Sequence, residues 1–448
     1  MMTQRITSTI CTAIVGALLG VLPVLGQGPG EPPLQLSMEE AVRIALEQNL
    51  QIELSRSALQ SAEARVSGAF GAFLPTVSVS GGYTKQLNEA QTVIVGGVPI
   101  QSSRPDNTLN SSASASLVVF DGFSRTSSYS VAQNAHNASI ENLAHVRKQI
   151  EFQARQAYLQ ALRAQQVVDV RRSDLDVSRD RLERIRVLVE VGTAQIGQVY
   201  SQEAEVANRE LEFEQSLTDA MVARNALALV LNLDPAGELQ LSTQGLVSSV
   251  AQEEIDATRA GLGTFEEMLA RQRETRRDLQ ELRLRIQAAV ASVEASRGGY
   301  WPTISTSLSY AWTKSSGIDA SDNTSLSVDL RYMPFDGFRT SEQVQIAEAQ
   351  RLQVEVEYQS QLASARSRLK SVLARFDGAD RQIRASQKAF AAARQNRYSA
   401  DERYRLGAGT EADFILANSQ YLSAQINQIN ALFNYQLVLY ELQFELGN

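Results

Sequence analysis

Cysteine and histidine are almost absent from this chain of 448 residues. It contains one cysteine, Cys11, and two histidines, His136 and His145. A metal cluster of cysteine and histidine, a Cys/His dyad or a Ser/His/Asp triad needs more of these side chains than the chain offers. The sequence therefore predicts no catalytic residues, no metal site and no cofactor.

An excess of basic residues is also missing. The chain has 42 basic and 50 acidic residues, and its formal net charge is -8. A protein that binds the phosphates of DNA or RNA concentrates lysine and arginine on one surface. Nucleic acid is therefore not expected as a partner, although an apolar content of 44% is ample for a folded protein.

Long hydrophobic runs are lacking after the first residues. Near the N-terminus, Arg5 precedes the apolar run Ala13–Leu22, a pattern typical of a secretory signal peptide, here residues 1–26. A transmembrane anchor is disfavoured because the run is short and is interrupted by glycine and proline. Cleavage of the signal peptide removes Cys11, so the mature chain is expected to fold without disulfides.

Four segments alternate between apolar and hydroxyl-bearing residues, as a strand with two different faces does. In the first of them, Val77 and Val79 alternate with Ser78 and Ser80. Their lengths reach the roughly 9–11 residues of a membrane-spanning strand. The pattern alone leaves two interpretations open, a half-buried pair of hairpins in a soluble sandwich and part of a membrane barrel. The strands are expected at 75–85, 108–120, 302–314 and 324–335.

Between the strands, apolar residues recur at spacings of three and four, which is typical of a coiled-coil seam. Long helices are expected at Ser124–Val189 and at Arg339–Leu406, the second broken only by Gly378. The first would extend about 100 Å at the usual rise per residue. Shorter helices are expected at Ser37–Phe70, Val199–Leu231, Phe265–Ser296 and Phe414–Leu446.

An internal repeat organises the chain. Phe120-Asp121-Gly122-Phe123 returns as Phe335-Asp336-Gly337-Phe338, and Val191-Gly192 returns as Leu406-Gly407 at the same offset. Each half reads helix, strand, strand, long helix, turn, helix. The expected division is a first repeat at 27–232, a linker at 233–264 and a second repeat at 265–448.

An Asp-Gly pair stands in each repeat where a strand gives way to the long helix. Asp121 and Asp336 are expected to cap free amide groups, and Gly122 and Gly337 to allow a sharp turn. We interpret these four residues as structural.

Several landmarks in register across both repeats resemble the outer-membrane efflux protein family, the TolC-like channels of Gram-negative bacteria. The segment Leu36–Asn49 is similar to the opening helix of that family, and Leu74-Pro75 and Trp301-Pro302 are similar to its strand entries. Pro334–Gly337 and Leu231–Pro235 also match its landmarks in order. The resemblance covers essentially the whole mature chain.

The resemblance implies a mainly α fold with a membrane β-barrel. A homotrimer in which each chain gives four strands would form a 12-stranded barrel in the outer membrane, continued through the periplasm by an α-barrel of antiparallel coiled-coil helices. Asp329 and Arg331 would line the pore with the hydroxyl-bearing faces. Segment 233–264 would form an equatorial belt, and loops Gln86–Asn107 and Ser315–Asn323 would face outside.

The resemblance also implies that the helix turns form periplasmic tips that meet an adaptor protein. The alternative is that the glycines only allow the tight turns and have no role in binding a partner. The tip residues are Val191, Gly192 and Thr193 in the first repeat, and Leu406, Gly407, Gly409 and Thr410 in the second.

Asp413 matches an aspartate of the family that constricts the closed pore, and Gln198 takes its place in the first repeat. Three Asp413 carboxylates around a trimer axis would favour cations and repel anions. Alternatively, Asp413 is part of a helix N-terminal cap with Thr410.

The function that the resemblance implies is that of a passive exit duct in a tripartite efflux or type I secretion system. Its expected partners are the outer-membrane lipid, a periplasmic adaptor and an inner-membrane RND or ABC pump. The alternative is a structural coiled-coil protein of the envelope without a pore. Drugs, metals and proteins all remain open as cargo.

Overall fold

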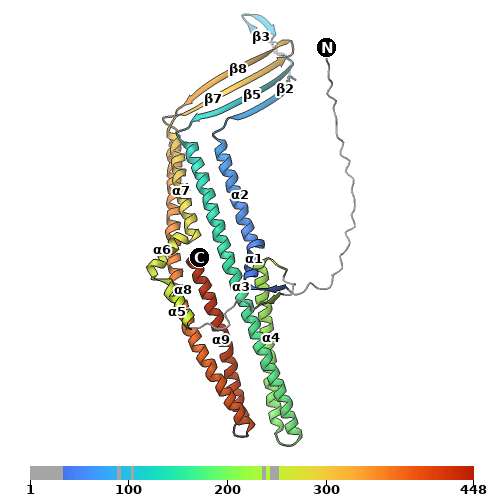
Figure 1. Cartoon of the computed structure of the whole chain (residues 1–448). Coiled ribbons are helices and arrows are strands. Elements are labelled where there is room, and N and C mark those ends of the chain that lie inside the picture. The colour runs from blue at the N-terminus through green and yellow to red at the C-terminus, as the bar shows by residue number, and fades with distance from the viewer. Residues whose placement is uncertain (1–33, 88–91, 102–104, 235–238, 243–251, 448) are drawn as a thin grey trace, which may run out of the picture.

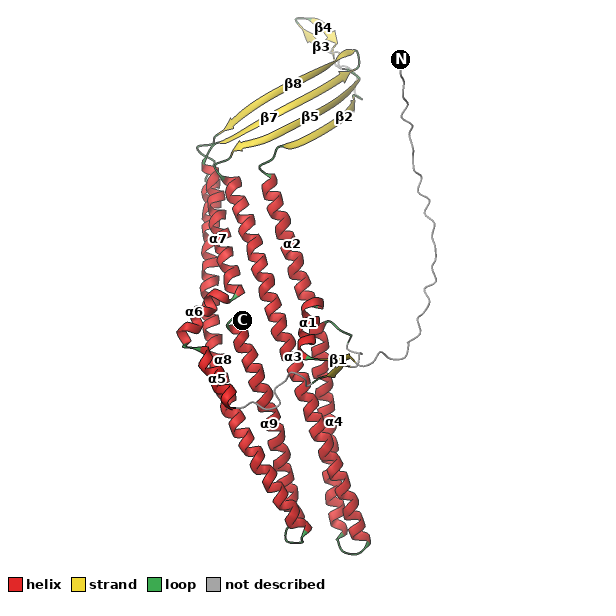
Figure 2. Cartoon of the chain, in the orientation of Figure 1, coloured by secondary structure: helices red, strands yellow, loops and turns green. Residues whose placement is uncertain are grey.

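The computed structural model describes residues 34–87, 92–101, 105–234, 239–242 and 252–447, so the expected signal peptide lies outside the described residues. The molecule is elongated, with a sheet at one end and helices running away from it (Figures 1 and 2). The sheet has four antiparallel strands in the order β2-β5-β7-β8. These strands are β2 (Thr76–Lys85), β5 (Asn107–Phe120), β7 (Thr303–Ser315) and β8 (Ile318–Arg331).

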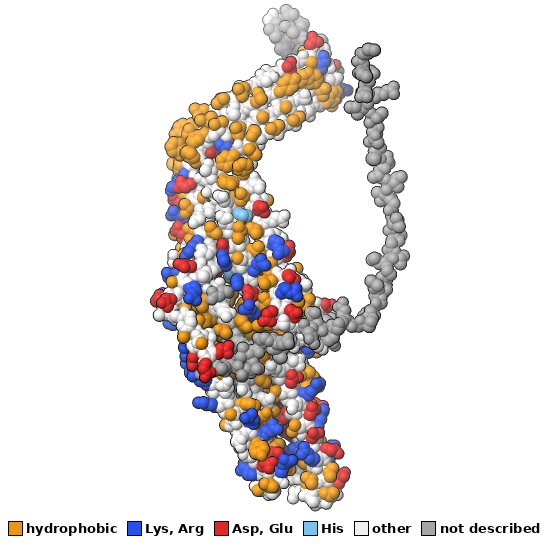
Figure 3. Space-filling model, viewed as in Figure 1, with side chains coloured by type: hydrophobic (Ala, Val, Ile, Leu, Met, Phe, Trp, Pro, Cys, Tyr) orange, Lys and Arg blue, Asp and Glu red, His pale blue; other side chains and the backbone are white. Residues whose placement is uncertain are grey.

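The sheet has one hydroxyl-bearing face and one apolar face. On the first, side chains pair across the strands, as between Ser78 and Ser114, whose Oγ atoms are 2.8 Å apart. The opposite face carries exposed apolar residues such as Val79, of which 80% is accessible. Figure 3 shows hydrophobic side chains gathered over the sheet and its junction with the helices. Further hydroxyl pairs join Thr76 to Ser116, Ser80 to Ser112, Ser307 to Ser327 and Ser309 to Ser325.

The loops at the far end of the sheet differ from expectation. The predicted loop Ser315–Asn323 is mostly strand, because β8 begins at Ile318 and pairs with β7. Gly317 has a φ of +74°, which allows the reversal in a very short turn. β8 also ends at Arg331, before the predicted limit of residue 335. Within the first loop lies a small hairpin of β3 (Thr92–Val95) and β4 (Val98–Gln101).

Two helices of 67 residues each form the shaft of the molecule. They are α3 (Ser124–Glu190) and α8 (Arg339–Arg405), each of which packs against a shorter antiparallel helix. α8 continues through Gly378, where a break was predicted, because one glycine costs a long helix only about 1 kcal/mol. The partner helices are α4 (Ile196–Leu231) and α9 (Glu411–Glu445). None of the helices among the described residues combines the length and hydrophobicity needed to cross a bilayer.

The shorter helices are more divided than the sequence suggested. The helix predicted at Ser37–Phe70 is two helices, α1 (Met38–Gln48) and α2 (Leu50–Gly71), because Asn49 is extended. The Oδ1 atom of Asn49 accepts a hydrogen bond from the amide of Gln51 at 2.9 Å and so caps the second helix.

The predicted helix at Phe265–Ser296 is also divided, at Arg276, into α6 (Phe265–Thr275) and α7 (Arg277–Arg297). The described part of the expected linker at 233–264 includes β6 (Leu239–Leu241), which pairs with β1 (Leu34–Leu36), and α5 (Gln252–Leu262).

Two apolar clusters hold the middle of the shaft. The first surrounds Tyr158 of α3, whose hydroxyl oxygen lies 2.8 and 2.6 Å from the carbonyl oxygens of Leu36 and Ser242 and can donate its proton to either. The second surrounds Phe376 of α8 and includes Tyr435 of α9. Each cluster thus packs one long helix against the elements that cross it at the middle of the shaft.

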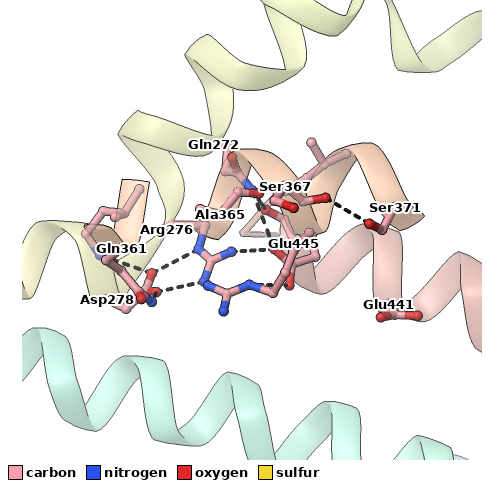
Figure 4. Close-up of polar contacts among 12 residues, drawn as sticks. Gln272, Arg276, Asp278, Gln361, Ala365, Ser367, Ser371, Glu441 and Glu445 are labelled. Atoms are coloured by element: carbon pink, nitrogen blue, oxygen red, sulfur yellow. Dashed lines mark hydrogen bonds and ion pairs between the residues drawn. The ribbon is translucent and has the colours of Figure 1, made fainter. Parts of the chain in front are cut away.

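A buried ionic cluster joins the end of α9 to the break between α6 and α7 (Figure 4). The Arg276 guanidinium contacts the carboxylates of Asp278 and Glu445, and all three residues are buried. Gln361 of α8 donates to Asp278 at 2.8 Å, and the side chain of Gln272 donates to the Glu445 carbonyl oxygen at 3.0 Å. The cluster therefore fixes the last turn of α9 against three other helices.

The Asp278 carboxylate is kept charged within this cluster. Burial alone would raise its pKa, but the hydrogen bonds and charge of Arg276, with the amide of Gln361, lower the pKa to about 2. Because this value lies below that of an unfolded aspartate, the stabilising contribution is present above about pH 4 and is lost as the pH falls toward 2.

Asp278→Asn is expected to destabilise the fold by about 3 kcal/mol at neutral pH, since it leaves Arg276 without one of its buried partners. Thermal unfolding in detergent, followed by circular dichroism, measures the difference from wild type. That difference should shrink by about 2 kcal/mol between pH 4 and pH 2. Asp377→Asn, at an exposed ion pair with Arg259, serves as the control. If the loss of stability in Asp278→Asn stays constant with pH, the lowered pKa of Asp278 is contradicted.

Candidate gate at the helical tips

The first tip joins α3 to α4 through a tight turn at residues 191–195. Gly192 has a φ of +77°, a conformation that costs glycine little. Its amide donates to the Val189 carbonyl oxygen at 3.0 Å, and the amide of Thr193 donates to that of Leu188 at 2.9 Å. Val191 is exposed at the end of the hairpin. The turn is thus closed by its own backbone and leaves an apolar side chain facing outward.

The second tip joins α8 to α9 and repeats this arrangement. Gly407 has a φ of +72°, and Leu406 beside it is exposed. Gly409 is closely surrounded, because a Cβ atom there would lie 3.2 Å from the Cβ of Arg403. The two tips lie at the end of the molecule remote from the sheet (Figure 1).

Asp413 lies in the first turn of α9 and takes part in a capping box with Thr410. Its carboxylate accepts hydrogen bonds from the amide and the hydroxyl of Thr410 at 3.1 and 2.7 Å, and these bonds lower its pKa. The structure therefore contains the N-terminal cap formed by Thr410 and Asp413. The side chain remains exposed, as is Gln198 at the corresponding place in α4. Capping does not remove its negative charge from the surface.

Arg181 of α3 lies against the second tip. Its guanidinium is 4.2 Å from the ring centroid of Phe414 and 4.8 Å from that of Tyr404. It is also 3.5 Å from the Glu411 carboxylate. One cation therefore holds both helices of the second hairpin to the first hairpin.

Asp174 precedes Arg181 by seven residues in α3 and forms a second polar contact between the hairpins. Its Oδ1 atom accepts from Asn418 of α9 at 3.1 Å, and its Oδ2 atom lies 3.2 Å from Nε of Arg209 in α4. Burial raises the pKa of the Asp174 carboxyl, and Arg209 and Asn418 offset part of that rise. Beside it a cleft of about 260 Å³ separates α3 from α8 and α9, with Arg397 and Tyr421 on its far wall.

Comparison with known proteins identifies this architecture. The sequence model of the outer membrane efflux protein family matches residues 41–233 and 268–448. The chain belongs to the outer membrane efflux protein family.

Individual relatives cover most of the chain. The outer membrane efflux protein BepC of Brucella suis is 22% identical over 92% of this chain and 86% of its own length. The CmeC outer membrane channel of Campylobacter jejuni matches with a TM-score of 0.80 at 16% identity, over 92% of this chain and 85% of its own. VceC of Vibrio cholerae matches with a TM-score of 0.75 at 16% identity, over 92% and 96% of the two chains.

Membership of this family decides the class and the location of the protein. It is an outer-membrane efflux channel with a helical tube in the periplasm, and it is not an enzyme. The resemblance noted in the sequence is confirmed, as is the fold class of long helices with a four-stranded antiparallel sheet. The matches to solved structures, all at low identity, support the fold alone.

The strand-helix junctions of the two repeats are built alike. The Asp121 carboxylate accepts from the amide of Arg125 at 3.0 Å, and that of Asp336 accepts from the amide of Thr340 at 2.8 Å. Gly122 has a φ of +67° and Gly337 a φ of +72°. These residues begin the long helices and lie far from the tips.

Sequence reasoning missed the polar residues between the hairpins. Asp174, Arg181 and Asn418 come from three places in the chain, and none belongs to a motif. No signal in the sequence marked them, because charged and amide residues on a long helix are mostly exposed. Their partners depend on the way two hairpins pack, which periodicity does not fix.

Arg181→Ala is expected to loosen the second tip, because it removes two ring contacts and an ion pair that together contribute about 1–2 kcal/mol. Hydrogen-deuterium exchange of the first two turns of α9 should become about tenfold faster. Arg179→Ala is the matched control, since Arg179 lies on the same helix, has a side chain that is 51% exposed and pairs with Glu210 of α4. Equal exchange rates in α9 for the two variants would show that Arg181 does not stabilise the second tip.

Proposed function

We propose that this protein is the exit duct of a tripartite efflux or type I secretion system, built by three copies of the chain. The observation that carries the proposal is the open four-stranded sheet with one apolar and one hydroxyl-bearing face. An apolar face suits contact with lipid, and a hydroxyl-bearing face suits a water-filled lumen. The duct conducts passively, and the energy comes from an inner-membrane RND or ABC pump.

The edges of the sheet support assembly. β2 and β8 are its outer strands, and each has backbone groups without a neighbour on one side. Lipid offers no hydrogen bonds to such groups, so a sheet in a membrane must close on itself. Four strands are too few to close, whereas three copies give the 12 strands of a barrel.

The tips support a periplasmic partner. Val191 and Leu406 expose apolar side chains at two adjacent turns whose amides are already bonded within each hairpin. Binding of an adaptor over these side chains buries apolar surface. The adaptor therefore stabilises the arrangement of the tips in which these side chains are most accessible. In this proposal the polar contacts of Arg181 and Asp174 hold the closed arrangement, and adaptor contacts bias the tips to open.

The hydroxyl-bearing face, which would line the lumen, supports a duct without selectivity for its cargo. The middle of the hydroxyl-bearing face carries serine, threonine and asparagine, and its charged residues Asp329 and Arg331 lie toward the helices. The middle of this wall therefore offers hydrogen-bonding groups rather than charged ones among the described residues. Selection of a drug, a metal or a protein then belongs to the pump.

Asp413 provides the test of the duct and its constriction. Asp413→Asn is expected to raise the anion permeability of single channels in planar bilayers and to weaken block by multivalent cations, because it removes the charge but keeps a capping side chain. Thr410→Ala is the matched control, since it removes the cap and keeps the charge. Equal selectivity and block in wild type and Asp413→Asn would place the constriction elsewhere, and the absence of any conductance would overturn the duct.

A further inference from the structure

A small cavity lies near the tips, where the first hairpin meets α9. It has a volume of about 20 Å³ and is lined from three helices, among others by Asp174 and Arg181 of α3, Gln202 and Arg209 of α4 and Phe414 of α9. This is the volume open to the centre of a water molecule, and roughly 10–15 Å³ of such volume is enough to hold one. The cavity therefore has room for a single water molecule and for no organic ligand.

Gln202 is the most deeply buried polar side chain of this cavity. Only 2% of it is accessible, and its Nε2 atom donates to the carbonyl oxygen and to Oγ of Ser178 at 3.1 and 2.9 Å. These bonds fix the amide, because a flipped amide would set its oxygen against the Ser178 carbonyl oxygen. Its Oε1 atom is buried and has no hydrogen-bond partner in the described part of the chain. An acceptor is thus left over beside the cavity.

The guanidinium of Arg181 provides matching donors. It lies over the rings of Phe414 and Tyr404, and its Nε atom is 3.5 Å from the Glu411 carboxylate. Its Nε and Nη2 atoms are nevertheless buried without a hydrogen-bond partner among the described residues. Buried donors and acceptors are normally paired, and ordered water is a common partner where the protein supplies none.

The charges around the cavity balance, which decides what it binds. The lining contains two guanidiniums and two carboxylates, those of Arg181, Arg209, Asp174 and Glu205. Oδ2 of Asp174 lies 3.2 Å from Nε of Arg209 without forming an aligned hydrogen bond. An anion would be repelled by the carboxylates and a cation by the guanidiniums. A water molecule is neutral and both donates and accepts hydrogen bonds, so it can serve Gln202, Asp174 and Arg181 at once.

The internal repeat shows that packing does not require these polar residues. Gln202 corresponds to Ala417 and Ser178 to Ala393 in the second hairpin. Ala417 is 2% exposed, so alanine fills the same position of a helix seam without any polar group. The first hairpin instead buries a glutamine with an unused oxygen, in the same cavity as the arginine that contacts the second tip. The polar cavity is therefore an addition to the hairpin that the two repeats share.

We infer that this cavity binds one structural water molecule, which accepts a hydrogen bond from Arg181 and donates to Gln202 and Asp174. The water fixes the guanidinium against the ring of Phe414. Gln202 is thus a positioning residue, which acts on the second tip through the water and Arg181. The water site belongs to the single chain, whereas its part in holding the closed tips rests on the proposed function.

A crystal structure at a resolution that shows ordered water tests the site directly. The expected result is a solvent peak within roughly 2.7–3.2 Å of Oε1 of Gln202 and of a guanidinium nitrogen of Arg181. A cavity without such a peak would overturn the inference. An anomalous peak there in crystals soaked in bromide would also overturn it, since a halide would then occupy the site.

Gln202→Leu tests the positioning role in the detergent-solubilised full chain. Leucine is similar in size but offers no acceptor, so hydrogen-deuterium exchange of the first two turns of α9 should become about fivefold faster. In Gln202→Leu/Arg181→Ala the exchange should be no faster than in Arg181→Ala, because the glutamine acts through the arginine. Unchanged exchange in Gln202→Leu, or effects of the two substitutions that multiply, would overturn the positioning role.

Ser178→Ala is the matched control. It removes one of the two bonds to Nε2 of Gln202 but keeps the bond to the Ser178 carbonyl oxygen and leaves Oε1 in place. Exchange in α9 should therefore stay within about twofold of wild type. An effect as large as that of Gln202→Leu would mean that only packing is involved and would overturn the role of the water. These readouts do not depend on conductance, so failure of the water site leaves the proposed duct intact, and a wild type without conductance leaves the water site intact.

Discussion

The backbone N–H and C=O groups along the outer edges of β2 and β8 limit how this protein can sit in a membrane. Among the described residues no strand pairs with these edges, and lipid offers them no hydrogen bonds. The two faces of the sheet differ in polarity, so the sheet has a defined inside and outside even in one chain. The internal repeat places the same strand-helix junction, Asp121-Gly122 and Asp336-Gly337, at the base of the sheet in both halves of the chain.

The shaft is held differently at its middle and at its tips. Apolar clusters around Tyr158 and Phe376, with the buried cluster of Arg276, fix the helices at the equator. Near the tips the hairpins meet through Arg181 and Asp174, whose contacts are polar and border a cleft. The proposed opening of the tips requires these contacts between the hairpins to break.

Much of this fold was predictable because its patterns are long. Alternation over whole strands, seams over 67-residue helices and an exact return of Phe-Asp-Gly-Phe are signals that chance does not produce. The breaks at Asn49 and Arg276 were not predictable, because each side chain also contacts a partner that is distant in the sequence. Asn49 donates to the carbonyl oxygen of Val230, and Arg276 pairs with Glu445. The short turn at Gly317 was missed because polar residues of β8 resemble a loop in sequence. For the site, the turn glycines and Asp413 were found from motifs, whereas the contacts between hairpins arise from packing alone.

In the proposed function, several copies of the chain together form a water-filled channel. Light scattering of the purified wild-type protein in detergent gives its mass, and a planar bilayer gives its conductance. A trimer that inserts and shows a small, cation-selective conductance is expected. A monomeric, water-soluble species without conductance would contradict the proposed function.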